Sequence, residues 1–367
     1  MNRTGGRPLR LAVLIALRPR KLGSLESWMV LTAREARARG HRIDLFARDP
    51  LHPVVKQALA DAGAGYHRLE ELEARPLQAA ARLGRAYDAL HLNLLAPRDR
   101  ATLIASAAWP ARVLYVDHIS GPPGDSSARG VLRQAMDRLS VVRFAGIAGV
   151  SDYVRDRDRA RFRRPDVRTL YNGVDLERFQ PPRSARRDGP LRVTAVANLI
   201  PEKGIEHLLR AAARLDAGTI HLSIVGDGPL GEPLRQRARE LGIDRRTSFL
   251  GLRDDVANLL RETDVFVHPA VWAEAFGLTI AEAMASGCAV VATRIGGIPE
   301  LVVDGESGLL VPAGNDVALA AALARLQHDE ALRAGLGAAA RRRAEQCFGL
   351  DACVQRHLDW CEEIGKR

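Results

Sequence analysis

The sequence predicts an α/β fold made of two doubly wound, Rossmann-like domains. Short apolar segments alternate with helical patterns along the chain, which is typical of parallel sheets covered by helices. The alternation breaks at residues 181–190, a polar stretch flanked by prolines, and then begins again. The 367 residues, 47% of them hydrophobic, suffice for two packed cores.

Each half of the chain supplies its own set of predicted strands, separated by helical patterns. In the first half the strands are residues 9–17, 42–47, 89–94, 113–116, 147–150 and 168–170, with the clearest helices at 25–39 and 128–139. In the second half they are residues 193–197, 220–225, 247–250, 265–268, 289–292 and 308–311. The chain beyond Pro312 reads as helical to its end. We therefore predict domains at residues 1–180 and 181–349.

The composition argues against several classes of protein. No run of about 18 apolar residues exists, and the apolar segment 9–17 lacks a cleavage site, so we expect a cytoplasmic protein. The four cysteines form no Cys-x-x-Cys pair, which argues against a zinc site and a disulfide framework. They are expected to be small core or helix-face residues.

The positive charge is confined to the first half of the chain. The net charge is +10, but residues 1–180 hold 31 Lys and Arg against 19 Asp and Glu, and the remainder holds 23 against 25. An anionic partner is therefore expected there, either a membrane surface or a phosphate-bearing acceptor. Nucleic acid is not expected, because aromatic residues are only 5% and no stacking platform accompanies the arginines. The densest basic run, residues 155–164, reads as a solvated helix.

The most informative segment runs from Glu274 to Gly297. A helix is predicted from about Gly277, because apolar residues recur at helical spacing on one face, namely Ile280, Ala283, Met284 and Gly287. Glu282 lies off that face. Glu274 lies in the loop after the strand 265–268, at the carboxyl end where such sheets bind ligands. The amides at the helix start suit an anionic or polyhydroxyl ligand.

Lys203 stands at the start of another predicted helix. A cation there opposes the helix dipole and costs roughly a few tenths of a kcal/mol unless an anion accompanies it. We therefore expect a phosphate partner. A lysine and helix N-termini would stabilise the negative charge that develops on a departing diphosphate.

Taken in order, the motifs of this chain resemble the family 4 retaining glycosyltransferases, group 1 glycosyl transferases of the GT-B fold. They are Gly23-Ser24, Arg39-Gly40-His41, His118, Ser151, Asn172-Gly173-Val174-Asp175, Pro201-Glu202-Lys203-Gly204, Gly226-Asp227-Gly228-Pro229-Leu230, Phe249-Leu250-Gly251, Glu274 to Gly297, Pro299-Glu300 and Asp304-Gly305-x-x-Gly308. The series is specific as a set, and no single motif would be.

The resemblance implies a role for each matching residue. Glu282 would accept hydrogen bonds from the ribose hydroxyls, Glu274 would hold donor-sugar hydroxyls, and Lys203 would meet the diphosphate. The implied catalytic residues are His118, Lys203 and Glu274. The implied donor-binding residues are Gly23, Asn198, Lys203, Gly226, Leu252, Glu274, Ala275, Phe276, Gly277, Leu278 and Glu282, with base contacts from the backbone near Leu252 and Arg253.

The resemblance also implies an activity. A hexosyl group would move from a nucleotide-sugar donor to a glycan, glycolipid or lipid-linked acceptor, with retention, by front-face attack, and without metal or cofactor. This would serve the synthesis of cell-surface polysaccharide or glycolipid. The two domains would face each other across a cleft. The acceptor would bind the first domain, onto which a helix within residues 350–367 crosses back, and the donor would bind the second. The basic first half makes an inner membrane face a candidate location.

Two features keep other interpretations open. Asn198 stands where the family commonly has an arginine that shares the diphosphate. This favours weaker donor binding, compensation by Arg294 or Arg253, or a degenerate transferase that binds nucleoside diphosphate without turnover. Residues 226–231 match Gly-x-Gly-x-x-Gly, so an NAD-dependent oxidoreductase is the other alternative. Asp156-Arg157-Asp158 matches a metal-binding Asp-x-Asp but follows no apolar strand, so no metal is expected there.

Overall fold

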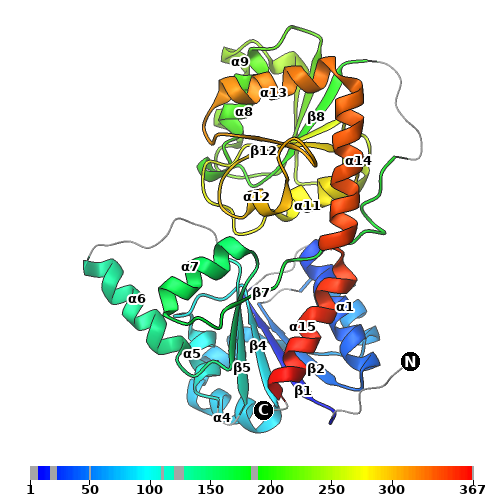
Figure 1. Ribbon diagram of the computed structural model, residues 1–367. Coiled ribbons are helices and arrows are strands. Elements are labelled where there is room, and N and C mark those ends of the chain that lie inside the picture. The colour runs from blue at the N-terminus through cyan, green and yellow to red at the C-terminus, as the bar shows by residue number, and fades with distance from the viewer. Residues whose placement is uncertain are drawn as a thin grey trace. The chain divides into compact units, whose positions relative to one another are not determined.

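The computed structural model describes residues 7–16, 23–48, 51–108, 111–119, 128–182 and 189–365. The chain divides into two compact units, each seen in Figure 1. Unit 1 contains the described residues up to Gly173 and those from Leu350 onward, and unit 2 contains Val174–Gly349.

The division falls upstream of the predicted boundary at residue 180. The reason is that the segment before the linker is bonded to unit 2. Arg261 donates to Arg178 O at 2.9 Å, and Arg341 donates to Phe179 O at 2.7 Å.

Unit 1 holds a seven-stranded parallel sheet in the order β3-β2-β1-β4-β5-β6-β7. Its strands are β1 (Arg10–Ile15), β2 (Arg42–Ala47), β3 (Gly65–Arg68), β4 (Ala89–Asn93), β5 (Arg112–Asp117), β6 (Gly146–Gly149) and β7 (Arg168–Thr169). The central strands are buried on both faces, as expected for continuous apolar runs in a parallel sheet. β3 is absent from the prediction because this half-exposed edge strand, Gly-Tyr-His-Arg, has no apolar run.

The strands of unit 1 are connected by helices that pack on the sheet. These are α1 (Ser24–Ala38), α2 (Pro53–Asp61), α3 (Leu69–Ala74), α4 (Pro76–Ala86), α5 (Arg100–Ser106), α6 (Ala128–Val141) and α7 (Asp152–Phe162). α1 buries an apolar stripe that includes Trp28, Met29 and Ala33.

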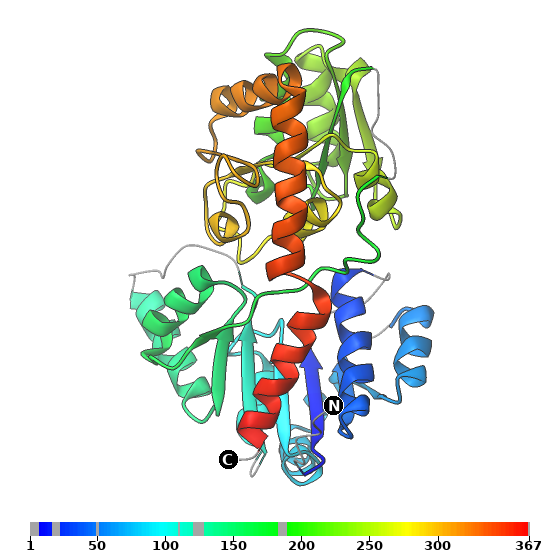
Figure 2. The same ribbon diagram turned by 45° about the vertical axis from the view of Figure 1, so that its right-hand side comes forward.

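The C-terminal helix α15 (Leu350–Gly365) packs on unit 1, beside α1 and over β4 and β5 (Figure 2). Gly146 makes room for it, since a Cβ there would lie 2.5 Å from Cζ2 of Trp360. Arg39, just after α1, donates to the Glu362 carboxylate at 2.9 Å, and His41 Nε2 lies 3.0 Å from the same group. These contacts connect the C-terminal helix α15 to the segment that follows α1.

Unit 2 holds a six-stranded parallel sheet in the order β10-β9-β8-β11-β12-β13. Its strands are β8 (Leu191–Val196), β9 (Ile220–Val225), β10 (Thr247–Gly251), β11 (Val265–His268), β12 (Ala289–Thr293) and β13 (Leu309–Val311). Its helical elements are η1 (Pro201–Lys203), α8 (Ile205–Ala213), α9 (Gly231–Glu240), η2 (Asp244–Arg246), α10 (Val256–Arg261), α11 (Leu278–Ala285), α12 (Ile298–Leu301), α13 (Asp316–His328) and α14 (Glu330–Cys347). Apolar residues of the sheet and of the helices packed on it form one core.

The predicted doubly wound α/β fold is confirmed in both units. In each sheet the first strand, β1 or β8, lies between the second and the fourth, so connections leave it in opposite directions. The carboxyl ends of β1 and β4, and of β8 and β11, therefore flank the switch points where such folds bind ligands. The cleft between the units stays a prediction.

Among the described residues, no helix has the length and apolar character needed to cross a bilayer. All four cysteines are free thiols, of which Cys288, Cys353 and Cys361 are buried.

Candidate functional site

Two loops meet at the switch point of unit 2. One follows β8 and carries Lys203 at the end of η1, and the other follows β11 and carries Glu274. Lys203 Nζ donates to Glu274 Oε1. The sequence predicts that an anion accompanies Lys203 at the helix start. In the chain itself, that anion is the carboxylate of Glu274. An ammonium has three N–H donors, so a phosphate oxygen can join it.

Close backbone contacts hold these two loops together. Val271 N donates to Glu202 O at 2.9 Å. Gly204 has a φ of +64°, and a Cβ there would lie 2.0 Å from Pro269 O. Only glycine permits this approach, so it fixes Lys203 beside the loop of Glu274.

Glu274 is mostly buried and has two partners. His268, the last residue of β11, places Nε2 3.2 Å from Glu274 Oε1, and Lys203 supplies the other contact. Burial raises the pKa of Glu274, but the hydrogen bonds and charges of His268 and Lys203 together lower it to about 2. At neutral pH the Glu274 carboxylate is therefore ionised and can only accept hydrogen bonds.

A glycine pair fixes the backbone of Glu274 from the other side. Gly296 has a φ of +59°, and a Cβ there would lie 2.4 Å from Glu274 O. Gly297 N donates to the same carbonyl oxygen at 2.8 Å. The two glycines at the end of the informative segment therefore help to position its first carboxylate.

The helix α11 begins just after Glu274. Gly277 caps it with a φ of +103°, and Ile280 N donates to Gly277 O at 3.0 Å. The N–H groups ahead of Ile280 are those that a helix leaves for caps or ligands. Ala275 and Phe276 are buried and Leu278 is half-buried, so their side chains pack in the protein and the backbone is what this segment offers a ligand.

The predicted face of α11 needs two corrections. Gly287 lies beyond the end of the helix with a φ of +74°, so it is a stop signal rather than a member of the face. Glu282 lies off the apolar stripe as predicted, yet it is only 9% exposed, because α11 is buried from Ile280 to Ala285.

Asn198, Gly226 and Leu252 follow β8, β9 and β10, at the same edge of the sheet. Asn198 and Leu252 are exposed. Gly226 has a φ of +132°, and a Cβ there would lie 1.9 Å from Ala197 O. Backbone packing therefore requires glycine at position 226, and this explains the first glycine of the Gly-x-Gly-x-x-Gly match without a dinucleotide.

Arg253 and Arg294, the candidates to compensate for the missing charge of Asn198, each have a carboxylate partner. Arg253 pairs with Asp255 at 2.7 Å, and Arg294 pairs with Asp304 at 2.5 Å. All four side chains are well exposed, so these are surface pairs that contribute little to stability.

Unit 1 carries the other two predicted residues, His118 and Gly23. His118 follows β5, and its Nε2 lies 2.8 Å from Oδ1 of Asn93 at the end of β4. Burial lowers the pKa of His118 to about 4, so it is neutral at pH 7. Gly23 caps α1: its N–H donates to Glu26 Oε2 at 3.0 Å, and a Cβ would lie 2.8 Å from that oxygen. Its approach to a donor stays a prediction.

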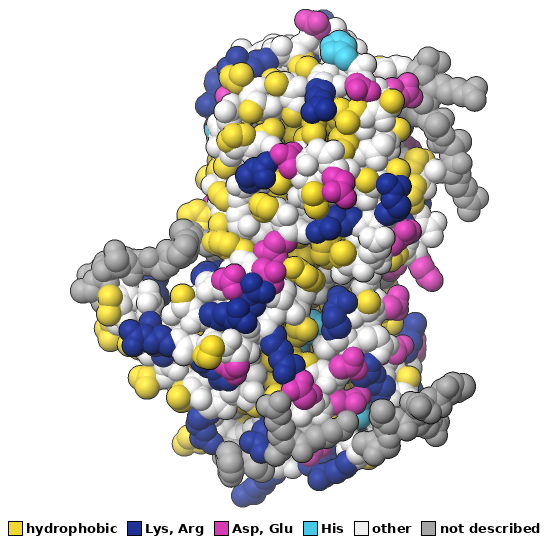
Figure 3. Space-filling view, viewed as in Figure 1, with side chains coloured by type: hydrophobic (Ala, Val, Ile, Leu, Met, Phe, Trp, Pro, Cys, Tyr) yellow, Lys and Arg dark blue, Asp and Glu magenta, His cyan; other side chains and the backbone are white. Residues whose placement is uncertain are grey.

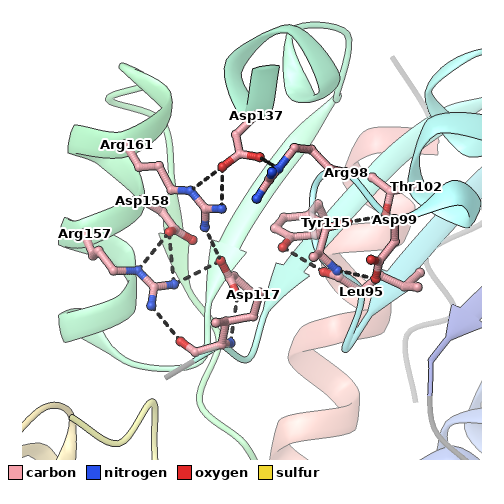
Figure 4. Close-up of polar contacts among 12 residues, drawn as sticks. Leu95, Arg98, Asp99, Thr102, Tyr115, Asp117, Asp137, Arg157, Asp158 and Arg161 are labelled. Carbon is pink, nitrogen blue, oxygen red and sulfur yellow. Dashed lines mark hydrogen bonds and ion pairs between the residues drawn. The ribbon is translucent and has the colours of Figure 1, made fainter. Parts of the chain in front are cut away.

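A buried cluster of arginines and carboxylates fixes the backbone on both sides of His118 (Figure 4). Arg157 of α7 donates to the Asp117 carboxylate at 3.0 Å and to Ile119 O at 2.7 Å. Asp117 Oδ1 also accepts a hydrogen bond from Ile119 N at 2.7 Å. One arginine therefore holds the residues before and after His118.

The same cluster corrects the interpretation of the basic run 155–164. Arg157 and Arg161 face the interior, and Arg161 donates to Asp137 at 2.7 Å. Burial, together with the charge of Asp117, raises the pKa of Asp158 well above its ordinary value. Only the opposite face of the helix is solvated. Within the described ranges, no group of His, Cys, Asp and Glu side chains is arranged to hold a metal ion.

Sequence reasoning missed three residues of these sites. His268 reads as the end of a buried strand, although its place at the carboxyl end of β11 is a signal for the site. Asn93 has the same place on β4. Arg157 gives no such signal, because its contacts to Asp117 and Ile119 come from tertiary structure.

Comparison with known proteins covers most of the chain. Residues 177–343 match the family described as Glycosyl transferases group 1, and residues 25–178 match Glycosyltransferase Family 4. The chain is 30% identical over 366 residues to the D-inositol 3-phosphate glycosyltransferase of Corynebacterium diphtheriae, covering 87% of this chain and 84% of that protein. A protein of the same name from Saccharomonospora viridis is 41% identical over 203 residues, 50% of this chain and 47% of its own length.

Two further proteins are similar to this chain, one a relative named for its sugar donor and one a solved structure that is similar in fold. The GDP-mannose-dependent alpha-(1-6)-phosphatidylinositol monomannoside mannosyltransferase of Mycobacterium tuberculosis is 33% identical over 293 residues, 73% of this chain and 72% of that protein. The crystal structure of Alr3699/HepE from Anabaena in complex with UDP has a TM-score of 0.78 at 22% identity. It covers 97% of this chain and 100% of that one, and at this identity it bears on the fold alone.

Proposed function

We propose that this chain moves a hexosyl group from a nucleotide sugar with retention of anomeric configuration. The proposal starts from its family, since the chain belongs to the group 1 glycosyl transferases of the GT-B fold. The observation that carries the proposal is the cluster of Lys203, His268 and Glu274 beside the start of α11, at the switch point of unit 2. A positive charge, an ionised carboxylate and the amides of a helix N-terminus together suit a sugar joined to a diphosphate.

Lys203 is the residue proposed to stabilise the leaving diphosphate. Departure of the diphosphate builds negative charge on its oxygens, and an ammonium held in place lowers the energy of that state without reorganising. The contact between Lys203 and Glu274 keeps the ammonium in position before the donor arrives. The amides at the start of α11 would share the same phosphate charge.

Glu274 is proposed to hold hydroxyl groups of the transferred sugar. Its lowered pKa, about 2, makes it an acceptor of hydrogen bonds and a poor proton donor at neutral pH. Two partners also draw charge from it, which weakens it as a nucleophile. We therefore favour front-face attack over a covalent intermediate, with Glu282 on the ribose and His118 on the transferred sugar.

Metal-independent transfer is part of the proposal, because Lys203 and the α11 amides supply the positive charge that a cation would otherwise bring. Turnover should be unchanged after dialysis against EDTA. Loss of turnover that returns with Mg²⁺ or Mn²⁺ would overturn this point.

The acceptor is proposed to bind unit 1 and to be a phosphate-bearing glycan or a lipid-linked glycan of cell-surface synthesis. Relatives named for inositol phosphate and phosphatidylinositol acceptors support this class. The net positive charge of residues 1–180 supports an anionic acceptor as well.

Peripheral attachment to an anionic bilayer, through α6, is the proposed location. α6 and the residue after it carry apolar side chains that are 48–74% exposed, namely Val131, Leu132, Met136, Leu139 and Val142. Arg133 and Arg143 are exposed on the same segment, and its carboxylate, Asp137, is buried. Figure 3 shows apolar and basic side chains together over this helix, at the left of the view. An apolar face edged by arginines suits anionic lipid, whereas two copies would bring arginines together.

Vesicle flotation tests this location. The chain should float with phosphatidylglycerol vesicles and not with phosphatidylcholine vesicles, and Leu132→Ser with Leu139→Ser should abolish flotation. Leu77→Ser is the control, because Leu77 is 85% exposed on a different helix of unit 1, α4. Equal flotation of all variants, or none with the wild type, would overturn the proposal.

The reaction is tested with a panel of UDP- and GDP-sugars, a glycolipid extract and mass spectrometry of the products. One donor should be consumed and one product formed, and Glu274→Gln should suppress both. Stabilisation of the chain by UDP or GDP without turnover of any donor would instead identify the degenerate, binding-only alternative. The oxidoreductase alternative has no support from the family.

A further inference from the structure

A row of four polar side chains crosses the interior of unit 1. His118 Nε2 lies 2.8 Å from Asn93 Oδ1, Asn93 Nδ2 bonds to His91 Nδ1, and His91 Nε2 lies 3.3 Å from Nδ1 of His357 on α15. Asn93, His91 and His357 are each at most 3% exposed. The row links the predicted sugar-contacting histidine to the C-terminal helix.

We propose that Asn93, His91 and His357 are positioning residues that hold His118 as its Nε2–H tautomer and leave its Nδ1 as a hydrogen-bond acceptor for a substrate hydroxyl. The inference rests on the proposed function, in which His118 meets the transferred sugar. It adds which of its ring atoms is available and what fixes that choice.

The direction of the row follows from what each group can donate. An amide oxygen only accepts, so His118 Nε2 must carry the proton that faces Asn93 Oδ1. The amide nitrogen only donates, so His91 Nδ1 is bare and its Nε2 carries the proton. That proton faces His357 Nδ1, which therefore accepts. Each tautomer is set by its neighbour.

The surroundings keep the imidazoles neutral, as this assignment requires. The ring of Trp28 lies 5.9 Å from that of His91 and 5.4 Å from that of His357, and the ring of Trp360 lies 6.3 Å from His91. Burial lowers the pKa of His91 to about 3 and that of His357 well below its ordinary value. A protonated imidazole would have two donors and would break the row.

The two ends of the row differ. His357 Nε2 is buried without a hydrogen-bond partner among the described residues, so the row ends in the core. His118 is half-buried, and within the same described ranges its Nδ1 has no recorded partner. A substrate hydroxyl can complete the row only at the His118 end.

The tautomers can be read directly from ¹H–¹⁵N correlation spectra of imidazole-labelled full-length protein. His118 should show Nε2–H and a bare Nδ1. In His357→Phe, which removes the acceptor of the His91 proton, the His118 signal should become a mixture of tautomers. His357→Gln keeps a carbonyl acceptor and should restore the single Nε2–H form. His221→Gln, in unit 2, is the matched control.

Should His357→Phe fail to fold, Asn93→Asp serves instead. A carboxylate still accepts from His118 but cannot donate to His91, so the His118 tautomer should persist while that of His91 changes. An Nδ1–H form of His118 in the wild type would overturn the inference, because the row would then run the opposite way. So would an unchanged His118 spectrum in a folded His357→Phe.

Turnover gives a second readout. Loss of one ordered hydrogen bond should lower kcat of His357→Phe about tenfold and leave the dissociation constant for UDP or GDP unchanged, with recovery in His357→Gln. The spectra do not depend on turnover. An inactive wild type with the predicted tautomers would therefore count against the proposed function alone, and an active enzyme with the other tautomer would count against this inference alone.

Discussion

The two units share the order of their first six strands, but their candidate site residues near the carboxyl ends of those strands differ in charge. Unit 2 gathers charges there, since Lys203 and His268 hold an ionised Glu274. In unit 1 the groups joined to His118 are neutral: His118 and Asn93 share a hydrogen bond, and Asn93 bonds in turn to His91. Burial lowers the pKa of an unpaired histidine, whereas nearby cations lower that of a buried carboxylate despite burial. The difference shows that partners decide the charge of a buried group more than the fold does.

The largest expected effect concerns the cluster behind His118. Arg157→Gln removes a cation that faces Asp117 and Asp158, both fully buried, and leaves the negative charge of this carboxylate pair undercompensated even if the pair shares a proton. The free energy of unfolding should fall by about 3–5 kcal/mol, measured by urea denaturation. Arg159→Gln is the matched control on the same helix. It breaks only an exposed pair with Asp156, so its effect should stay below about 1 kcal/mol. Equal losses in the two variants would show that the cluster is not a structural centre.

The charged cluster of unit 2 is expected to matter for catalysis. Glu274→Gln and Lys203→Met are each expected to lower transfer about 100-fold, because in the proposed mechanism each residue supplies electrostatic stabilisation at the reacting centre. The double variant should lose little more than either single one, since the two groups act together. Glu306→Gln, at an exposed position of the same unit, is the control. Additive losses, measured by product mass spectrometry on folded variants, would separate the roles of the two residues.

The pH dependence of local stability should distinguish the units. Burial lowers the pKa of His91 to about 3 and of His118 to about 4, whereas an unfolded histidine titrates near 6.5. Their stabilisation is complete above pH 6.5 and is lost as the pH falls towards those values, by about 1.4 kcal/mol per pH unit for each proton. Glu274, with a folded pKa of about 2 against an ordinary 4.5, keeps its stabilisation down to pH 4.5.

Hydrogen exchange, corrected for its intrinsic pH dependence, measures this difference. Between pH 6.5 and 5, amides of β4 should lose protection before those of β11. His91→Gln should remove part of the loss in β4. Simultaneous loss in both strands would mean that the units unfold as one.

The sequence accounts for much of the fold and for the charged site, for reasons that can be seen in particular residues. Lys203 and Glu274 lie in short motifs at the ends of apolar strands, so local pattern suffices to find them. The row from His118 to His357 could not be read, because it depends on the register of β4 with β5 and on the docking of α15. The role of Arg157 could not be predicted from the basic run, because its buried and exposed faces are distinguished only once α7 packs on unit 1. β3 was missed because an edge strand needs no apolar run.

The smallest expected effect concerns Asn198, which is exposed in the loop that also carries Lys203. Asn198→Arg adds a cation at a solvated position, where one ion pair contributes about 0.2–1 kcal/mol, so UDP or GDP should bind about 1.4- to 5-fold more tightly. The gain should shrink at high salt. Gln236→Arg, exposed on α9, adds the same charge elsewhere and should leave the dissociation constant unchanged. Equal gains in both variants would indicate net charge alone. No gain in either would mean that Asn198 lies away from the diphosphate, so that the charge of the donor site depends on Lys203 and its carboxylate partner.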